Sequence, residues 1–388
     1  MIIVCDPVCW DLEHIPVNAA LLEIIHRAFP SEEVVFYGEG SQIENLRAQL
    51  TADIANSIFW RRVVLPLRYA SFFERWRDDF TLLRHLLHTL RQASSGYLVL
   101  CSVAPATLMA LKMLLLGGAA GDKWVQVVCH GVLTELKGWR SRRPWLRMQD
   151  FRTSFIFGGH RRIQYLLLEE SIRQAVLKLF PSLEGHLAVL DHPVPANEAS
   201  IQPIPFQPPF RIGFLGLAST AKGFPNFLHI ASTVKSRVSD RVEFCALAWT
   251  PESMDSSLLD CLTIKPGSQQ VSRSEFIRHI QQLHYVCLPY QGDYYELSPS
   301  GVLLDAIASG KPILASRIEI VANMVSRFGD IGYLCNDGQD FCDTILDIVQ
   351  HADEGHYRVQ SRTMEQVRLS RTPQSLAIKY RELSRMPA

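Results

Sequence analysis

One stretch of the chain, residues 285–315, constrains the fold more than any other. It begins with an apolar run at 285–289 that is typical of a buried strand, and it ends with a second such run at 312–315. Between them lie a loop rich in small residues and a segment whose apolar side chains, such as Val302 and Ala306, recur at helical spacing. A strand, a loop, a short helix and a strand in this order form the repeating unit of a parallel sheet with crossover helices.

The start of the predicted helix has the composition of a phosphate-binding site. We expect Ser300 and Gly301 at the helix N-terminus, followed by Val302. Free backbone N–H groups and the positive end of the helix dipole can hold a phosphate there. Glycine lets a bulky anion approach the backbone closely. Asp305 comes one turn later, where its carboxylate could accept hydrogen bonds from a ribose.

Strand-like and helix-like segments alternate along the rest of the chain as well. In the first half we predict strands at 2–5, 34–37, 63–67, 97–101, 125–129 and 155–157, and helices at 18–29, 72–90, from Pro105 onward, and at about 161–180. In the second half the predicted strands are 211–217, 242–249, 285–289 and 312–315, with helices at 226–238 and 373–383. This alternation predicts the α/β class, with doubly wound, Rossmann-like parallel sheets.

A change in composition divides the chain in two. Residues 191–209 contain six prolines, which restrict the backbone and cannot donate to a sheet ladder. We interpret this segment as a connection between domains. The predicted organisation is a first domain at 1–195, a Pro-rich linker at 196–210, a second domain at 211–372 and a terminal helix at 373–388.

Residues 296–312 resemble the donor-site motif of the retaining glycosyltransferases with the GT-B fold, the large "glycosyl transferases group 1" type of family. The agreement is closest at Gly301, Ala306, Ala308, Gly310 and Pro312. Two positions differ, because the second acid is Asp305 rather than glutamate and Glu296 lies one residue farther away than the family spacing. The resemblance implies that Ser300, Gly301 and Val302 hold the donor diphosphate, that Asp305 binds the ribose and that Glu296 orients the sugar.

A second match lies at residues 213–223, where a strand, a glycine turn at Gly216 and the pair Lys222-Gly223 follow one another. In the resembling family an arginine and a lysine in this place neutralise the donor diphosphate. Lys222 and Gly223 agree with that pattern, whereas Leu217 occupies the arginine position. The resemblance implies that Lys222 carries the positive charge with help from backbone donors. A solvated lysine after a turn is the alternative.

The first domain contributes candidates through their position after predicted strands. His130 follows the strand at 125–129, and family members often have a histidine here that contacts the donor sugar; a core or capping histidine is the alternative. Asp11, His14 and Asn18 follow the first strand, and Glu135 lies in the loop after His130. We predict these four as acceptor contacts, with helix capping as the alternative for Asn18.

Taken as a whole, the resemblance implies a hexosyltransferase with two Rossmann-like domains that face each other across a cleft. The first domain would bind the acceptor, the second would bind a UDP- or GDP-linked sugar, and the terminal helix would return to the first. The acceptor would be a saccharide or a lipid-linked saccharide, in surface polysaccharide or glycoconjugate synthesis. Transfer would proceed with retention, and no metal or other cofactor is expected. Two alternatives stay open: a catalytically silent GT-B protein that serves as a scaffold, which Leu217 favours, and a nucleotide-sugar epimerase.

Composition narrows the classes of partner. The chain has 39 basic and 39 acidic side chains, so no overall field attracts it to nucleic acid, and we expect no such partner. Its nine cysteines form no Cys-x-x-Cys pair and mostly lie in apolar runs, which predicts buried reduced thiols, neither disulfides nor a zinc site. The start of the chain lacks the pattern of a signal peptide. We therefore expect a cytoplasmic protein.

One surface segment mixes cations with tryptophans. Residues 137–147 contain Lys137, Trp139, Trp145 and several arginines, a combination that suits an anionic membrane surface. Two interpretations of this segment stay open: a mobile surface loop, and peripheral contact with the inner face of the membrane.

Overall fold

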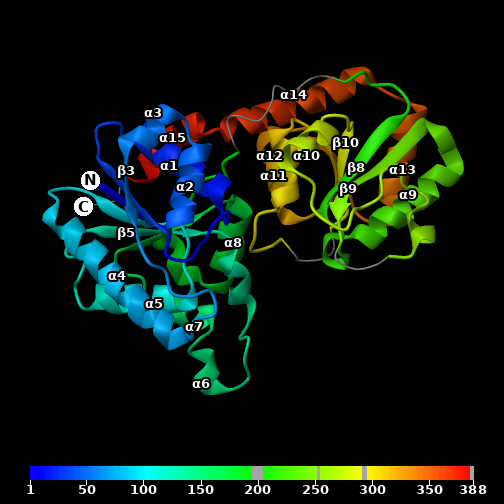
Figure 1. Ribbon diagram of the computed structural model, residues 1–388. Helices are drawn as coiled ribbons and strands as arrows, with labels where there is room; N and C mark the ends of the chain where they lie inside the picture. Colours follow the sequence, from blue (N-terminus) through cyan, green and yellow to red (C-terminus); the bar gives the residue numbers. More distant parts are fainter. Residues whose placement is uncertain (195–203, 251–253, 291–294, 385–388) are drawn as a thin grey trace. The chain divides into compact units, whose positions relative to one another are not determined.

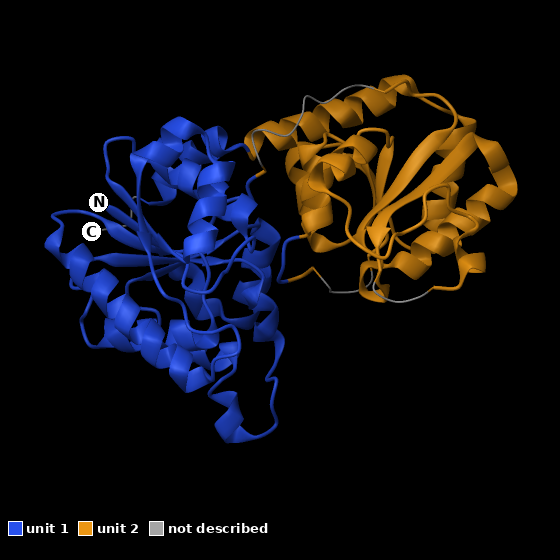
Figure 2. Cartoon of the chain, viewed as in Figure 1, with its two compact units in different colours: residues 1–193, 297–299, 372–388 blue, residues 194–296, 300–371 orange. Residues whose placement is uncertain are grey.

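The computed structural model describes residues 1–194, 204–250, 254–290 and 295–384. Within them the chain forms two compact units (Figure 2). Unit 1 comprises Met1–Pro193, Leu297–Pro299 and Thr372–Ala388, and unit 2 comprises Val194–Glu296 and Ser300–Arg371. Tyr294 and part of the predicted linker lie outside the described residues.

Unit 1 is built on a seven-stranded sheet in the order β3-β2-β1-β4-β5-β6-β7, in which neighbouring strands are parallel (Figure 1). The strands are β1 (Ile2–Cys5), β2 (Val34–Gly38), β3 (Ile58–Arg62), β4 (Tyr97–Leu100), β5 (Trp124–Cys129), β6 (Ile163–Leu167) and β7 (Leu187–Val189). The helices are α1 (Ile15–Ala28), α2 (Gly40–Gln49), α3 (Ala52–Ser57), α4 (Phe72–Gln92), α5 (Pro105–Leu116), α6 (Pro144–Arg147), α7 (Phe151–Ile156), α8 (Glu170–Leu179) and α15 (Pro373–Leu383), with 3-10 helices η1 (Val132–Lys137) and η2 (Pro181–His186).

Helices cover both faces of this sheet. Side chains alternate along each strand, so every strand contributes residues to the core on both faces. In β1, Ile3 and Cys5 pack with α4, α5, α7 and α8, whereas Ile2 and Val4 pack with α1, α2, α3 and α15. Each buried strand therefore needs an apolar residue at every position. This is why the central strands are continuous apolar runs in the sequence.

Unit 2 has the same plan with a five-stranded parallel sheet in the order β12-β11-β10-β8-β9. The strands are β8 (Phe210–Leu217), β9 (Val242–Trp249), β10 (Tyr285–Leu288), β11 (Ile313–Ser316) and β12 (Gly332–Cys335). The helices are α9 (Phe224–Val238), α10 (Arg273–Ile280), α11 (Gly301–Ala308), α12 (Glu319–Phe328), α13 (Gly338–Gln350) and α14 (Glu354–Ser370), with 3-10 helices η3 (Thr220–Lys222), η4 (Ser239–Arg241) and η5 (Ser256–Leu259). One face packs against α9 and α13, and the other packs mainly against α10, α11, α12 and α14.

The terminal helix α15 belongs to unit 1, where it packs against α1. Tyr380 is fully buried, and its hydroxyl donates to Gln126 Oε1 on β5 at 2.6 Å. Arg381 donates from Nε to the carbonyl oxygen of Ala28 at 2.7 Å. The last helix of the chain is thus part of the core built by the first strands.

Two predicted strands of the first half are wrong. Residues 63–67 form no strand, and the pairing segment is β3, an edge strand whose Arg61 and Arg62 are exposed. Residues 155–157 end helix α7, and the predicted helix at 161–180 is in fact β6 followed by α8. Gly158 and Gly159, both with positive φ, separate α7 from β6, and this break permits the change of element.

All nine cysteines are free thiols, as predicted, and all except the partly exposed Cys261 are buried. In the described part of the chain, no helix is both long enough and apolar enough to span a bilayer.

Candidate functional site

In unit 2, the order of the strands reverses between β8 and β10, which lie side by side in the sheet. The loop after β8 leads to β9 on one side, and the loop after β10 leads to β11 on the other. Ligands of doubly wound sheets bind at such a point, beyond the carboxyl ends of the strands. The two loops approach closely, because a Cβ added at Gly223 would lie 1.8 Å from the carbonyl oxygen of Pro289. Gly223 is therefore required for packing, since it also has a φ of 77°.

The N-terminus of α11 faces this point. Ser300 is the N-cap, and its hydroxyl accepts the N–H of Leu303 at 3.2 Å and lies 2.5 Å from the hydroxyl of Tyr290. Because Ser300 is 1% exposed, its hydroxyl serves the cap and not a ligand in solution. Gly301 is exposed, and a Cβ added there would meet no atom within 4 Å. An anion can therefore approach the first backbone N–H groups of the helix.

Three of the predicted residues converge beside that helix end. A Cβ added at Gly216, which has a φ of 84°, would lie 3.3 Å from Val302 Cγ2 and 3.6 Å from Lys222 Nζ. The Lys222 ammonium thus lies at the turn that ends β8, next to the first turn of α11. Burial lowers the pKa of Lys222, and the nearby Asp305 carboxylate acts in the opposite direction. Lys222 and Asp305 are therefore close enough for their charges to interact.

Asp305 has a partner that sequence reasoning missed. Arg273, the first residue of α10, places Nη1 2.6 Å from Asp305 Oδ1. The Arg273 side chain is 52% exposed and that of Asp305 is 24% exposed, so the pair lies at the surface of the site. Arg273 belongs to no motif of the sequence. Its one signal is its place at the start of the helix that precedes β10.

Glu296 is partly exposed and is the last residue before the chain returns to unit 1. The neighbouring Tyr295 is buried against Tyr290, with ring centroids 4.4 Å apart. Lys222 and Glu296 belong to unit 2, whereas His130 belongs to unit 1. A common site for these three residues therefore stays a prediction.

In unit 1, three histidines that follow the strands β1, β5 and β7 form a row. His130 follows β5, and its Nδ1 lies 3.3 Å from Nε2 of His14, the residue before α1. His130 Nε2 lies 3.4 Å from Nε2 of His192, which sequence reasoning left in the Pro-rich segment. Burial, together with the nearby His192 and His14, lowers the pKa of His130 to about 3. His130 is therefore neutral at physiological pH and can exchange hydrogen bonds without carrying charge.

The row continues to a buried carboxylate below the loop that follows β1. His14 Nδ1 lies 3.3 Å from Cys9 Sγ, which lies 3.7 Å from Ser102 Oγ, and this hydroxyl donates to Asp6. Burial raises the pKa of Cys9, so it is a thiol and not a thiolate.

Asp6 is fully buried and holds that loop from below. Its Oδ1 accepts the backbone N–H groups of Val8 and Cys9, each at 3.1 Å. Its Oδ2 accepts Asn18 Nδ2 at 2.6 Å and Gln42 Nε2 at 3.1 Å. Asn18 is thus committed to Asp6 and is 1% exposed, so an acceptor cannot reach its side chain in this conformation. It does not cap α1 either, because the N-cap is His14.

The other predicted acceptor residues differ in their surroundings. Asp11 is exposed, has a φ of 47°, and accepts a 2.5 Å hydrogen bond from the Ser41 hydroxyl. Glu135 lies in η1 and forms an ion pair with Arg140. Burial raises the pKa of Glu135 and Arg140 opposes the shift. Asp11 therefore faces solvent at the end of the sheet, whereas Glu135 is engaged with the segment that follows it.

Within that segment, the two tryptophans have different environments. The guanidinium groups of Arg147 and Arg152 lie over the ring of Trp139, 5.4 Å and 5.5 Å from its centroid. Trp145, on α6, is 65% exposed. Trp139 is 41% exposed, so Trp145 is the more exposed of the two tryptophans.

Among the residues that the structure describes, no group of three or more His, Cys, Asp or Glu side chains could hold a metal ion.

No family model matches the sequence, and no curated protein matches it. Solved structures do match the fold. A glycosyltransferase from Rickettsia africae has a TM-score of 0.64 at 10% identity, over 100% of this chain and 99% of that chain. Anabaena HepE, crystallised with UDP and glucose, gives 0.63 at 12% identity over 99% of both chains. WaaG, a glycosyltransferase of lipopolysaccharide biosynthesis, gives 0.62 at 10% identity over 100% of both chains.

The fold is GT-B. This likeness and the two parallel sheets confirm the predicted fold class.

Proposed function

We propose that the chain is a glycosyltransferase that takes sugar from a UDP- or GDP-linked donor bound by unit 2. The observation that carries the proposal is the convergence of Gly216, Lys222 and Val302 beside the open N-terminus of α11, at the switch point of the sheet. Two of the similar solved structures hold such ligands, HepE with UDP-glucose and an Escherichia coli trehalose-6-phosphate protein with UDP-2-fluoro glucose.

In this proposal the donor diphosphate accepts hydrogen bonds from the backbone N–H groups of Gly301 and Val302 and pairs with the Lys222 ammonium. Asp305 accepts hydrogen bonds from the ribose, while Glu296 and His130 stay the predicted sugar contacts. Burial lowers the pKa of Lys222, and a bound diphosphate would act in the opposite direction, as Asp305 does. Donors that already point at the place where negative charge develops on the leaving diphosphate lower the barrier to transfer. Retention of configuration without a metal belongs to the same proposal.

A catalytically silent scaffold is the second candidate, and Leu217 in the place of a cation is the feature that favours it. Arg273 weighs against it. Its guanidinium is held by Asp305, one turn into α11, and so brings a second cation to the same edge of the sheet. In this proposal the donor site has two basic side chains, Lys222 and Arg273, of which only Lys222 belongs to the sequence motif. An epimerase would need two facing carboxylates, and Asp305 is instead paired with Arg273.

The acceptor side of the proposal is a saccharide or lipid-linked saccharide at the inner face of the membrane. The exposed Trp145 and the arginines around it support membrane contact. Sedimentation with phosphatidylglycerol vesicles tests this: the protein should bind them, should bind phosphatidylcholine vesicles less, and should lose binding in the Trp145→Ala variant. Equal recovery with both lipids would contradict it.

The test of donor binding is the melting temperature in the presence of UDP, GDP and their hexose derivatives. A ligand that binds only the folded state stabilises it by an amount set by its concentration relative to Kd. One nucleotide should stabilise the wild type, and Lys222→Ala and Asp305→Ala should both lose the effect. Lys265→Ala is the matched control, because Lys265 also lies in unit 2 and pairs with Asp260 at 2.9 Å. No shift by any nucleotide at millimolar concentration would overturn the donor site. Stabilisation without sugar turnover would favour the scaffold.

A further inference from the structure

Unit 2 contains a cavity of about 510 Å³ at the end of its sheet opposite the proposed donor site. Residues 204–206, which precede β8, line one side of it, and Gly310 and Lys311, which precede β11, line another. The first turns of α14 complete the lining with Glu354, Tyr357, Arg358, Ser361 and Arg362. Because β8, β10 and β11 are parallel, this cavity lies at their amino ends, whereas the donor site lies at their carboxyl ends.

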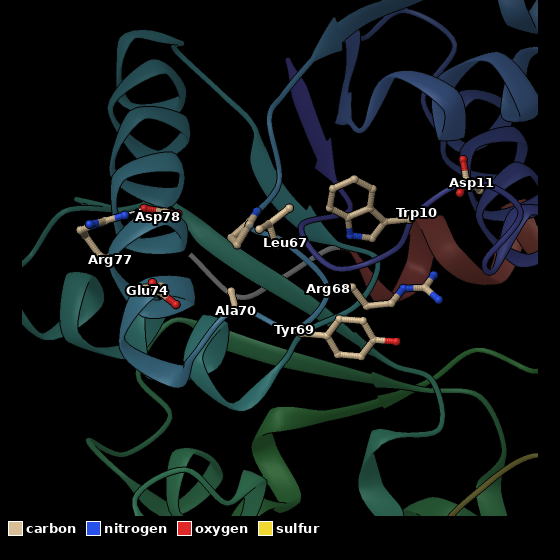
Figure 3. A pocket seen from close by; sticks show the side chains of 10 residues that line it. Trp10, Asp11, Leu67, Arg68, Tyr69, Ala70, Glu74, Arg77 and Asp78 are labelled. Atoms are coloured by element: carbon tan, nitrogen blue, oxygen red, sulfur yellow. Dashed lines mark hydrogen bonds and ion pairs between the residues drawn. The ribbon is translucent and has the colours of Figure 1, made fainter.

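The cavity of unit 1 shown in Figure 3 is of a different kind. Its volume is about 640 Å³, and its charged side chains are Asp11, Glu74, Asp78, Arg68 and Arg77. The carboxylates outnumber the guanidiniums, so the lining has no excess of positive charge. The cavity also lies after β1 and β3, on the acceptor side of the proposed function. It therefore adds no separate site.

The lining of the unit 2 cavity carries an excess of positive charge. Its cations are Lys311, Arg358 and Arg362, and its one carboxylate is that of Glu354. Arg358 pairs with Glu354 at 2.8 Å, which leaves the charges of Lys311 and Arg362. Within the described parts of the chain, no carboxylate pairs with either of these two side chains. A cavity with such a lining favours an anionic ligand.

Lys311 is a buried cation without a counter-charge. It is 3% exposed, and its Nζ donates to the carbonyl oxygen of Gln281 at 2.7 Å. Burial lowers the pKa of Lys311 to about 8. A buried ammonium without a paired anion costs free energy. An anion in the cavity would offset this cost through its charge alone, because electrostatic attraction at low dielectric does not need direct contact.

Arg362 is the unpaired cation that a ligand can reach. Its side chain is exposed, and it lies one turn after Arg358 on the same face of α14. The guanidinium group presents its N–H donors in a fork that matches the oxygens of a phosphate. A phosphate monoester carries a charge of about −1.5 to −2 at pH 7. It would therefore compensate both Lys311 and Arg362.

The apolar part of the lining is already fixed in place. Phe206 stacks on Tyr357, with ring centroids 4.3 Å apart and an angle of 13° between the rings. Pro205 is held by His284, whose Nε2 donates to the Pro205 carbonyl oxygen at 3.0 Å, while its Nδ1 accepts the N–H of Arg211 at 2.9 Å. A ligand that packs against a preorganised surface loses less entropy on binding.

From these observations we infer that the cavity between residues 204–206, Lys311 and α14 binds a small phosphate monoester. Its volume of about 510 Å³ lies within the range of small-molecule pockets, about 300–1,000 Å³. Arg362 and Arg358 hold the phosphate, and the rest of the ligand packs against Pro205 and Phe206. The inference does not rest on the proposed function, because the donor site lies at the other end of the sheet.

Calorimetry of the full chain with phenyl phosphate and glucose 6-phosphate tests the site. Both monoesters should bind the wild type, and glucose should not. Arg362→Gln should lower the affinity for both by about tenfold or more, because it removes hydrogen bonds between charged groups. Its exposed position should leave folding intact.

Two further variants sharpen the test. Arg241→Gln is the matched control, because Arg241 is also an exposed arginine of unit 2 and lies outside the cavity; the affinity should be unchanged. Glu354→Gln removes the carboxylate of the lining and should raise the affinity by about two- to fivefold. An unchanged or lower affinity in Glu354→Gln would contradict recognition by charge.

The remaining outcomes separate this site from the donor site. Absence of binding by both monoesters at millimolar concentration would overturn the inference, as would equal affinities in the wild type and Arg362→Gln. Loss of binding in Lys222→Ala but not in Arg362→Gln would mean that the phosphate binds at the donor site, and it would overturn the inference as well. Inorganic phosphate bound as tightly as the esters would contradict a role for the apolar lining. Nucleotide stabilisation should be the same in the wild type and Arg362→Gln, so failure of the proposed function would leave this site standing.

Discussion

Replacing His130 by glutamine should make unit 1 less sensitive to acid. The imidazole of His130 has a pKa of about 3 in the folded chain, against an ordinary value of 6.5. Between these pH values the unfolded chain binds a proton that the folded chain does not, so the free energy of unfolding falls as the pH falls. The slope is about 1.4 kcal/mol per pH unit for one such group. Between pH 8 and pH 5, His130 should therefore cost the wild type about 2 kcal/mol.

Glutamine can keep hydrogen bonds to the neighbouring histidines but cannot take up a proton at these pH values. The variant should lose about 2 kcal/mol less than the wild type between pH 8 and pH 5, whatever its stability at pH 8. Urea unfolding followed by tryptophan fluorescence is a suitable assay, because six of the seven tryptophans lie in unit 1. His85→Gln, at an exposed position of α4, is the control and should behave as the wild type does.

Equal losses of stability in the wild type and His130→Gln would refute this reasoning, because His130 would then titrate when folded much as it does when unfolded. A histidine that stays neutral can contact a sugar hydroxyl but cannot stabilise negative charge as a cation. The experiment therefore also limits what His130 can do in catalysis.

Three further predictions concern other sites. Arg273→Ala should weaken binding of a nucleoside diphosphate by about 10- to 100-fold in calorimetry, since hydrogen bonds to charged groups contribute about 1.5–3 kcal/mol; an equal loss for the free nucleoside would move Arg273 away from the phosphates. Gly223→Ala should lower the free energy of unfolding in urea by at least about 2 kcal/mol, because its Cβ would meet the Pro289 carbonyl oxygen at 1.8 Å. Gly301→Ala, whose Cβ has open space, should keep the stability of the wild type and lose nucleotide affinity. Burial raises the pKa of Asp79 to about 6 from 3.8, so the wild type loses stability as the pH rises through this range. The free energy of unfolding of Asp79→Asn should exceed that of the wild type by about 2–3 kcal/mol at pH 8 and by little at pH 4. An equal gain at both pH values would contradict the shift.

The sequence predicted the interior of both sheets well, because a strand buried on both faces is apolar at every position. It failed at β3 and β6 for two reasons. Arg61 and Arg62 can pair at the edge of the sheet with their side chains in solvent, so β3 lacks an apolar run. The apolar residues at 155–157 are equally compatible with a helix end, and a short run does not distinguish the two.

The residues of the candidate sites also fall into two groups, those within a continuous motif and those that meet distant partners. Lys222, Gly301 and Asp305 could be proposed from the sequence, because each motif is continuous in sequence and lies at the end of a strand. Arg273 and Asp6 were not, since their importance comes from partners 32 and 36 residues away, Asp305 and Gln42. Only the topology of the sheets brings such side chains together, and a single sequence does not specify which distant residues will meet.

The return of the chain to unit 1 at Thr372 sets an order on biosynthesis. Unit 2 is complete at Arg371, while unit 1 still lacks α15 and its buried Leu376, Ala377 and Tyr380. On the ribosome, domains generally fold as they emerge, beginning with the N-terminal one. Here the domain that starts first is completed only after the second one, so the apolar surface of α1 stays uncovered until α15 has been synthesised. A chain truncated after Arg371 would contain all of unit 2 but would lack α15 of unit 1. Unit 1 would then expose apolar surface and become a substrate for chaperones and proteases.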